Sequence, residues 1–170
     1  QKLFAEMPDK AFLRRQNPPN ARRLVTFAER MTKAGYEVDT SSSGTLQNSL
    51  FKVEDPDLRK GMETLLVKTL QRARYYIGEQ VAEEARQHYS LNLPLYTHFT
   101  SPTRRYADIV VHRQLDAILS EGAVEFTEDL ENLAKTAEQC NNKKDSAHCA
   151  QEQSVHIESC RMMDKKSQDL

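Results

Sequence analysis

The residues best suited to chemistry lie in one run, YTHFTSPTRRYADIVVHR, which occupies positions 96–113. Ser101 followed by Pro102 is typical of the cap and first position of a helix, which places Arg104 and Arg105 in the first turn. Cations there oppose the helix dipole by about 0.3–1 kcal/mol each. The pattern therefore favours an external anion, most simply a phosphate, that completes the site. Its donors would be backbone amides, the two guanidinium groups and the hydroxyls of Thr100, Ser101 and Thr103.

A plainer interpretation of the same run stays open. Asp108 follows one turn later and can pair with Arg104 or Arg105, so that the run only caps a surface helix. His112, four residues after Asp108, can be a proton-transfer group held by that carboxylate or an ordinary helix-face pair.

Aromatic residues precede the arginines. Tyr96, His98 and Phe99 can offer hydrogen bonds and a stacking face to a base, as sites for single-stranded RNA do. They can equally pack against the elements beneath them. Both interpretations are compatible with the sequence.

The segments around this run set its position. Residues 91–99 alternate loosely and contain Pro94, which predicts an extended approach. The helix from Ser101 is expected to run to about Glu121 and to end at Gly122.

A last helix is expected from about Thr127 to Met163, because apolar residues recur at helical spacing. A break at Asn141-Asn142 is an open alternative. Such a helix would be unusually long for a globular protein.

Two further helices are predicted upstream. Asn20 caps one that runs to about Ala34, with Gly35 just past its end. The serine-rich stretch 39–44 is typical of a loop.

The strongest helix begins with Asp55 as its cap and Pro56 in its first turn, and its apolar stripe continues to Ile77, before Gly78. Its other face carries basic residues that can be solvated surface or an RNA contact. No clear sheet pattern is present, so we expect a mainly α fragment.

Composition narrows the function classes. The 170 residues are 38% hydrophobic and 29% charged, which is typical of one soluble domain or a piece of one. No apolar run approaches the ~20 residues of a membrane-spanning helix, so no membrane partner is expected. The formal net charge of −1 means that any polyanion must bind local basic clusters. The odd cysteines Cys140, Cys149 and Cys160 lack disulfide or zinc spacing and indicate reduced thiols in the cytoplasm.

The run 96–113 closely resembles the signature of the RNase II/RNase R superfamily, the RNB-domain 3′→5′ exoribonucleases. Three other segments resemble family motifs: Ala11-Phe12-Leu13-Arg14-Arg15, Asn92 to Tyr96, and Gln151 to Ser154. The resemblance implies that residues 1–170 are part of an RNB domain, namely the C-terminal helical half of that α/β catalytic domain. The N-terminal half and any flanking OB, cold-shock or S1 domains would lie outside this chain.

The resemblance also implies functions. Family members release nucleoside monophosphates from RNA with Mg²⁺ held by clustered aspartates, and Arg104 matches the arginine that touches the scissile phosphate. The residues expected to bind RNA or its phosphates are Tyr96, His98, Thr100, Ser101, Arg104 and Arg105. The expected partners are single-stranded RNA, the remaining half of the RNB domain and OB-type domains of the parent.

Departures from the family pattern leave two functions open. Thr103 replaces an aliphatic residue and Gln16 replaces a histidine, both of which suggest a divergent branch. No aspartate cluster occurs here: Asp39, Asp55 and Asp57 are scattered, so no metal ligand is assigned and the isolated chain is expected to be inactive. The parent is therefore expected to be an exoribonuclease of mRNA metabolism or, alternatively, an inactive mRNA-binding translational repressor of a fungal branch.

Overall fold

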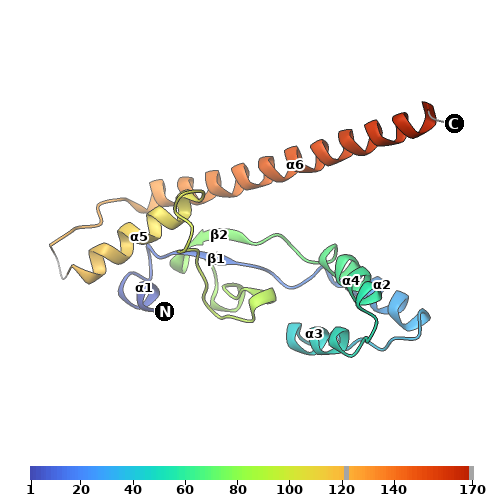
Figure 1. Cartoon of the computed structure of the whole chain (residues 1–170). Coiled ribbons are helices and arrows are strands. Elements are labelled where there is room, and N and C mark those ends of the chain that lie inside the picture. Colours follow the sequence, from blue (N-terminus) through green and yellow to red (C-terminus); the bar gives the residue numbers. More distant parts are fainter. Residues whose placement is uncertain (121–122, 169–170) are drawn as a thin grey trace.

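The computed structural model describes residues 1–120 and 123–168 and has two lobes, which confirms the expected mainly α fragment (Figure 1). In chain order the α-helices and strands are α1 (Lys2–Glu6), β1 (Phe12–Arg15), α2 (Ala21–Lys33), α3 (Ser43–Phe51), α4 (Pro56–Val67), β2 (Arg74–Ile77), α5 (Tyr106–Leu119) and α6 (Leu130–Gln168). The strand lobe contains α1, β1, β2, α5 and the start of α6, and the helical lobe contains α2, α3 and α4.

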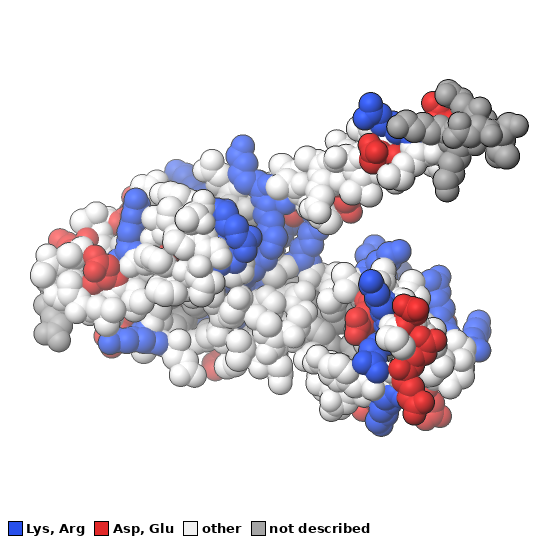
Figure 2. All heavy atoms as spheres, viewed as in Figure 1, with Lys and Arg blue, Asp and Glu red and all other residues white. Residues whose placement is uncertain are grey.

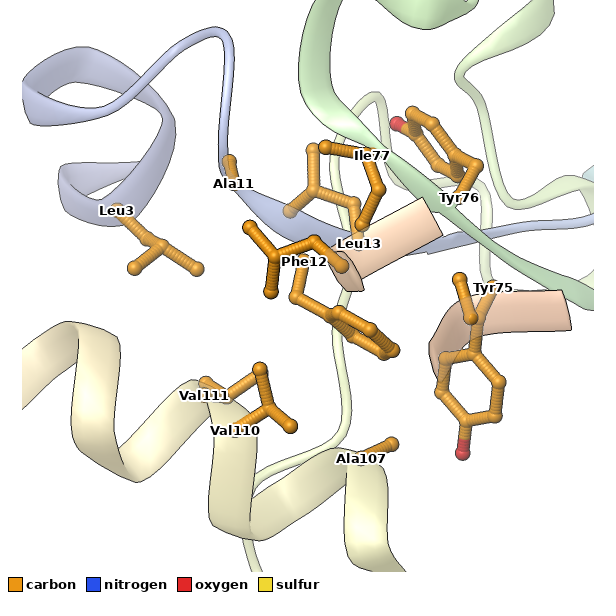
Figure 3. Packing of buried hydrophobic residues seen from close by; sticks show 12 residues of the cluster. Leu3, Ala11, Phe12, Leu13, Tyr75, Tyr76, Ile77, Ala107, Val110 and Val111 are labelled. Atoms are coloured by element: carbon orange, nitrogen blue, oxygen red, sulfur yellow. The ribbon is translucent and has the colours of Figure 1, made fainter. Parts of the chain in front are cut away.

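The strand lobe is built on an antiparallel pair in which Phe12 lies opposite Ile77 and Arg14 opposite Tyr75. These four side chains share one face, because directly opposed residues lie on the same side of a sheet. The Phe12 ring packs 5.5 Å from the Tyr75 ring, and Val110 and Val111 of α5 lie against that face (Figure 3). Residues of α6 also pack on this core. Its buried apolar contacts on the two helices are Ala107, Val110, Val111, Leu133 and Ala137.

The prediction of one helix from Asp55 to Ile77 was correct at its start and wrong at its end. Asp55 does cap α4, but this helix ends at Val67 and residues 74–77 form β2. Tyr75, Tyr76 and Ile77 have the aromatic and β-branched side chains that favour strands, and pairing with β1 buries them. Helical spacing over so short an apolar run does not distinguish the two structures.

The helical lobe has its own apolar core, made by Phe27, Met31, Leu46, Leu50 and Met62. Its first helix is as predicted: Asn20 Oδ1 accepts the Arg23 amide at 3.2 Å, and Gly35 follows the end with φ +87°. The predicted loop 39–44 is only partly correct. Ser42 and Thr45 form a reciprocal capping box, so α3 already begins at Ser43.

Gln16 joins the segments that connect the lobes. Its buried side chain donates to the Gln71 carbonyl at 2.8 Å and accepts the Ser90 amide at 3.0 Å. Gln71 in turn donates to the Pro18 carbonyl at 2.9 Å. The departure from the family's histidine therefore supplies a structural amide that both donates and accepts.

The helix α6 is continuous through Asn141-Asn142 and begins at Leu130, three residues later than expected. Asn141 does not break it, because its side-chain amide serves β2: Oδ1 accepts the Tyr75 amide at 2.8 Å and Nδ2 donates to the Tyr75 carbonyl at 3.0 Å. Beyond this contact, residues 146–164 are exposed and the helix projects from the body (Figure 1).

Several remaining features can be placed. The expected end of the preceding helix, at Glu121 and Gly122, lies outside the described residues, and α5 itself ends at Leu119. Of the described helices, none is long and apolar enough to cross a membrane. The three cysteines are free thiols in the structure.

Gly78 offers the sharpest test of this fold. A Cβ there would lie 1.7 Å from the Pro8 carbonyl oxygen, whereas a Cβ at Gly61 in α4 would meet nothing within 4 Å. We predict that Gly78→Ala destabilises the strand lobe by about 3 kcal/mol or more. Gly61→Ala, the matched control, should stabilise its helix by about 0.5–1 kcal/mol.

Hydrogen–deuterium exchange of the full protein that contains this chain measures both effects locally. Amides of β1 and β2 should exchange much faster in Gly78→Ala and at the wild-type rate in Gly61→Ala. Equal exchange in the two variants would contradict the close approach of Gly78 to Pro8.

Candidate functional site

The signature run has a different local structure from the one predicted. The helix α5 begins at Tyr106 rather than at Ser101, and residues 102–104 form a turn. The amides of Arg104 and Arg105 both donate to the Ser101 carbonyl at 3.2 Å, which closes this turn. The prediction that both arginines lie in a first helical turn is therefore wrong.

The physical reason is Asp108, whose side chain is completely buried two residues into α5. Its Oδ2 accepts the Ser101 amide at 2.7 Å and Arg105 Nη2 at 2.8 Å, while Oδ1 accepts Arg105 Nε at 2.8 Å. The carboxylate thus folds the turn back onto the helix. We call this arrangement the Asp108 clamp.

The pKa values agree with a charged clamp. Burial of Asp108 opposes its ionisation, but hydrogen bonds from Arg105 and the Ser101 amide outweigh burial and hold the pKa of the carboxyl below its ordinary value. The hydrogen bond to Asp108 in turn raises the pKa of Arg105. A bidentate pair of this kind fixes the orientation of both side chains.

The clamp separates the two arginines by role. The alternative prediction, in which Asp108 pairs with one of the two arginines, is correct for Arg105. Two nitrogens of Arg105 donate to the Asp108 carboxylate. Arg104 is exposed, and in the described part of the chain it forms no ion pair. Its guanidinium group therefore remains available to an external anion.

The aromatic residues before the turn pack together and onto β2. His98 Nδ1 lies 2.6 Å from the Tyr75 hydroxyl, and the His98 ring makes edge contacts with Tyr75 at 5.5 Å and Tyr96 at 5.7 Å. Burial, followed by the charges of Arg14 and Arg105, lowers the pKa of His98 to about 4. His98 is therefore neutral at pH 7 and can act only as a neutral donor or acceptor.

The structure gives His112 a partner other than Asp108, and it shows how Thr100 and Ser101 lie. His112 Nε2 lies 2.7 Å from the Phe99 carbonyl, and the two rings pack at 4.2 Å, so Asp108 does not hold His112. Thr100 is exposed at the start of the turn. Ser101 acts through its backbone, with its amide on Asp108 and its carbonyl on the turn amides.

A cavity of about 910 Å³ lies between this turn and α6, and we call it the signature groove. Lys and Arg side chains gather where α6 leaves the body (Figure 2). The groove is lined by aromatic and basic side chains, among them Tyr75, His98, Arg104, Arg105, Lys143 and Lys144.

Lys143 and Lys144 were missed at the sequence level. They lie on α6 directly after Asn141, whose hydrogen bonds to Tyr75 place this part of the helix against β2. Partial burial and then repulsion by Arg14 and Arg105 lower the pKa of Lys144. A weak signal was present, because the polar run Asn-Asn-Lys-Lys interrupts the apolar pattern of the helix.

Arg14 is a second missed residue. Its side chain is 3% exposed, its guanidinium lies 4.6 Å from the centre of the Tyr75 ring, and its Nη1 has no hydrogen-bond partner among the described residues. Burial, with a smaller contribution from repulsion by Arg105, lowers the pKa of Arg14. The neighbouring Tyr75 and Tyr96 raise this pKa but do not offset the effect of burial. A buried cation with an unpaired donor costs free energy that an anion nearby would offset.

Carboxylates balance only part of this positive charge. Asp108 neutralises Arg105, and Asp145 is shared by Arg72 at 3.0 Å and Arg74 at 2.7 Å. In the ranges 1–120 and 123–164, whose side chains the structure describes, no ion pair involves the remaining cations of the site. These are Arg14, Arg104, Lys143 and Lys144.

The side chains that could bind a metal ion are scattered among the described residues. No group of three or more histidine, cysteine, aspartate or glutamate side chains among them could hold a metal ion. Asp55 caps α4, and Asp39 accepts the Ser41 amide at 2.9 Å. Both carboxylates thus serve local structure.

Comparison with known proteins gives consistent matches. The model of the RNB domain matches residues 1–121. The chain is 46% identical to Protein SSD1 of Saccharomyces cerevisiae over 161 residues, which are 95% of this chain and 13% of that protein. It is 37% identical to DIS3-like exonuclease 2 of Xenopus tropicalis, over 91% of this chain and 19% of that protein. The chain therefore spans less than a fifth of the length of these relatives.

Solved structures show the same fold. The structure described as yeast Ssd1, a pseudonuclease, matches with a TM-score of 0.84 and 47% identity, over 91% of this chain and 19% of that one. Mycoplasma genitalium RNase R in complex with single-stranded RNA matches with a TM-score of 0.67 and 24% identity, over 84% of this chain and 22% of that one.

The Asp108 clamp predicts strong coupling between its two partners. Arg105→Ala should leave a buried carboxylate without its counter-ion and destabilise the turn by about 3–5 kcal/mol. Arg105→Ala/Asp108→Ala should cost clearly less than the sum of the single substitutions. Arg104→Ala, the matched control one residue earlier, should leave stability unchanged.

Amide exchange of residues 100–108 in the full protein measures these energies. Additive effects of the two single substitutions, or an equal loss in Arg104→Ala, would show that the clamp does not organise the turn.

Proposed function

The chain belongs to the RNB-domain family, and we propose that it supplies the part of an RNB domain that binds the phosphate backbone of single-stranded RNA. The remaining half of the domain and OB-type domains would complete the binding channel in the longer protein. Residues 1–170 would thus be a partial RNB domain.

The observation that carries this proposal is the unbalanced charge of the signature groove. Arg104, Lys143 and Lys144 face one cavity without carboxylate partners among the described residues, and the buried Arg14 adds positive charge behind it. Phosphate contacts by such side chains release counterions and dominate nucleic-acid affinity. The chain's net charge of −1 makes this local concentration necessary.

The lining also suits single strands rather than duplexes. The half-buried His98 lies beside the cations with its ring edge against buried Tyr75, and sequence-tolerant binding of single strands combines stacking surfaces with basic grooves. The Tyr75 hydroxyl can donate to Nδ1 of neutral His98, which leaves Nε2–H as a donor to a phosphate or base.

Each predicted site residue takes a role in this proposal. Arg104 would contact the phosphate directly, Arg105 and Ser101 would hold the turn through Asp108, and exposed Thr100 would add a hydroxyl donor. Tyr96 would support the ring of His98. In a hydrolytic parent, Arg104 would stabilise negative charge that develops on the scissile phosphate.

Hydrolysis would need groups outside this chain. RNB nucleases generally use Mg²⁺, and the described residues do not provide a ligand cluster for it. We therefore place its ligands in the remaining half of the domain and expect the isolated chain to be inactive as a 3′→5′ exoribonuclease. We assign the cytoplasm as the location of the parent.

A binding-only parent is the second candidate, and the comparisons favour it. Identity is 46% to yeast SSD1, whose solved structure is described as a pseudonuclease, and 37% to DIS3-like exonuclease 2 of Xenopus tropicalis. The proposed groove would serve both parents equally, since RNA binding precedes hydrolysis. In the second case the protein would be an mRNA-binding translational repressor.

Arg104→Ala in the full protein tests the proposal. In a binding-only parent the substitution should weaken RNA binding modestly and lower the slope of log K against log salt by about 0.7, one single-strand phosphate contact. In a hydrolytic parent it should reduce turnover by about 10²–10³, far more than affinity. Arg104→Lys should restore function only partly, because a point charge lacks the bidentate fork.

Fluorescence anisotropy with labelled poly(A) across a salt series, together with nucleotide release, gives both readouts. Arg113→Ala is the control, since its side chain pairs with Glu128 away from the groove. Unchanged turnover and an unchanged salt slope in Arg104→Ala would refute the phosphate role.

A further inference from the structure

A second basic cavity lies on the helical lobe, away from the signature groove. It has a volume of about 350 Å³ and lies between α2 and α4, and we call it the lobe groove. Its cationic lining residues are Arg22, Arg23, Arg30 and Lys68.

The cations of the lobe groove are not neutralised. In the described part of the chain none of the four takes part in an ion pair, although the structure contains seven such pairs elsewhere. Arg22, Arg30 and Lys68 are exposed above a wall formed by Phe27 and Leu65. Like charges gathered around one cavity repel one another unless an anion lies between them.

The groove has a defined frame. Arg23 Nη1 donates to the Lys68 carbonyl at 3.4 Å, and the Asn20 amide donates to the Thr69 carbonyl at 3.1 Å. These bonds join the start of α2 to the end of α4. The charged groups of Arg22, Arg30 and Lys68 make no hydrogen bond to another described residue, so they can contact a ligand.

Further cations connect this groove with the signature groove. The segment after Lys68 carries Arg72 and Arg74, which reach α6 and share the single carboxylate of Asp145. Two arginines on one aspartate leave a net positive charge, and Lys144 of the signature groove directly precedes Asp145 on α6. Positive charge therefore continues from one groove toward the other.

A ligand with repeated negative charges fits this arrangement better than one with a single anionic group. We propose that the lobe groove is a second binding site for the phosphate backbone of the same single-stranded RNA. RNA would run from the signature groove past Arg72 and Arg74 to the lobe groove. This inference rests on the proposed function, because it assumes that the signature groove binds RNA.

Two linked sites should bind a long RNA more tightly than a short one, because the second contact becomes intramolecular. The test variant is Arg22→Gln/Arg30→Gln/Lys68→Gln, which spares Arg23 because its guanidinium donates to the Lys68 carbonyl. The matched control is Lys33→Gln/Lys52→Gln/Lys60→Gln. It removes the same charge from exposed positions of the same lobe outside the groove.

The experiment measures anisotropy of the full protein with oligouridines of increasing length across a salt series. The groove variant should lose about 10-fold or more in affinity for long RNA, with a salt slope lower by about 2, three single-strand contacts. Short RNA should bind it as tightly as wild type, and the control variant should lose much less. An equal loss for short and long RNA, or no difference from the control, would overturn the proposal.

Two further arms separate the alternatives. Polyglutamate is the probe for an acidic protein partner: if it binds the lobe groove and long RNA does not, the RNA proposal is wrong. Arg104→Ala/Lys143→Ala/Lys144→Ala tests the proposed function separately. If this variant binds short RNA with wild-type affinity, the proposed function of the signature groove is wrong. A loss of affinity for long RNA in the lobe-groove variant would still show that the lobe groove binds RNA.

Discussion

The arrangement of the site depends on one buried carboxylate. Asp108 has no exposed surface, and an ionised group in that position must be fully hydrogen-bonded to be tolerated. Ser101 and Arg105 supply those bonds. The geometry of these bonds sets the turn at residues 102–104 and the start of α5. The position of Arg104 in that turn therefore depends on the hydrogen bonds of Asp108 with Ser101 and Arg105.

The helix that carries Asp108 is itself fixed to the sheet. Gln114 of α5 is completely buried, accepts the Phe12 amide at 3.1 Å and donates to the Lys10 carbonyl at 2.6 Å. On the other side, Asn141 of α6 pairs with both backbone groups of Tyr75. Amide side chains thus place two helices on one small sheet. The cations of the turn before α5 and those of α6 consequently face the same cavity.

Some of this could be predicted from the sequence. Asn20 and Asp55 have the side chains that cap helices, and these local signals gave correct starts for α2 and α4. The type and spacing of Arg104 and Arg105 also predict an anion site; Arg105 pairs with Asp108 instead, and an external anion at Arg104 stays a prediction. Capping and spacing are local properties, and local properties are visible along the chain.

The remainder depends on contacts between distant residues. Tyr75 to Ile77 form a strand only because Phe12 to Arg15 lie beside them, about sixty residues earlier in the chain. The sequence leaves a helix break at Asn141 open because the partner of its side chain, the backbone of Tyr75 in β2, is distant along the chain. Likewise, Lys143 and Lys144 line the signature groove because the contact of Asn141 with Tyr75 places α6 against β2.

We propose that RNA phosphates lie in the signature groove against Arg104 and α6. Photo-crosslinking of 4-thiouridine RNA to the full protein, followed by mass spectrometry, tests it most directly. We expect crosslinks to His98 and to the α6 segment containing Lys143 and Lys144. Efficient crosslinking confined to residues outside this groove would contradict it.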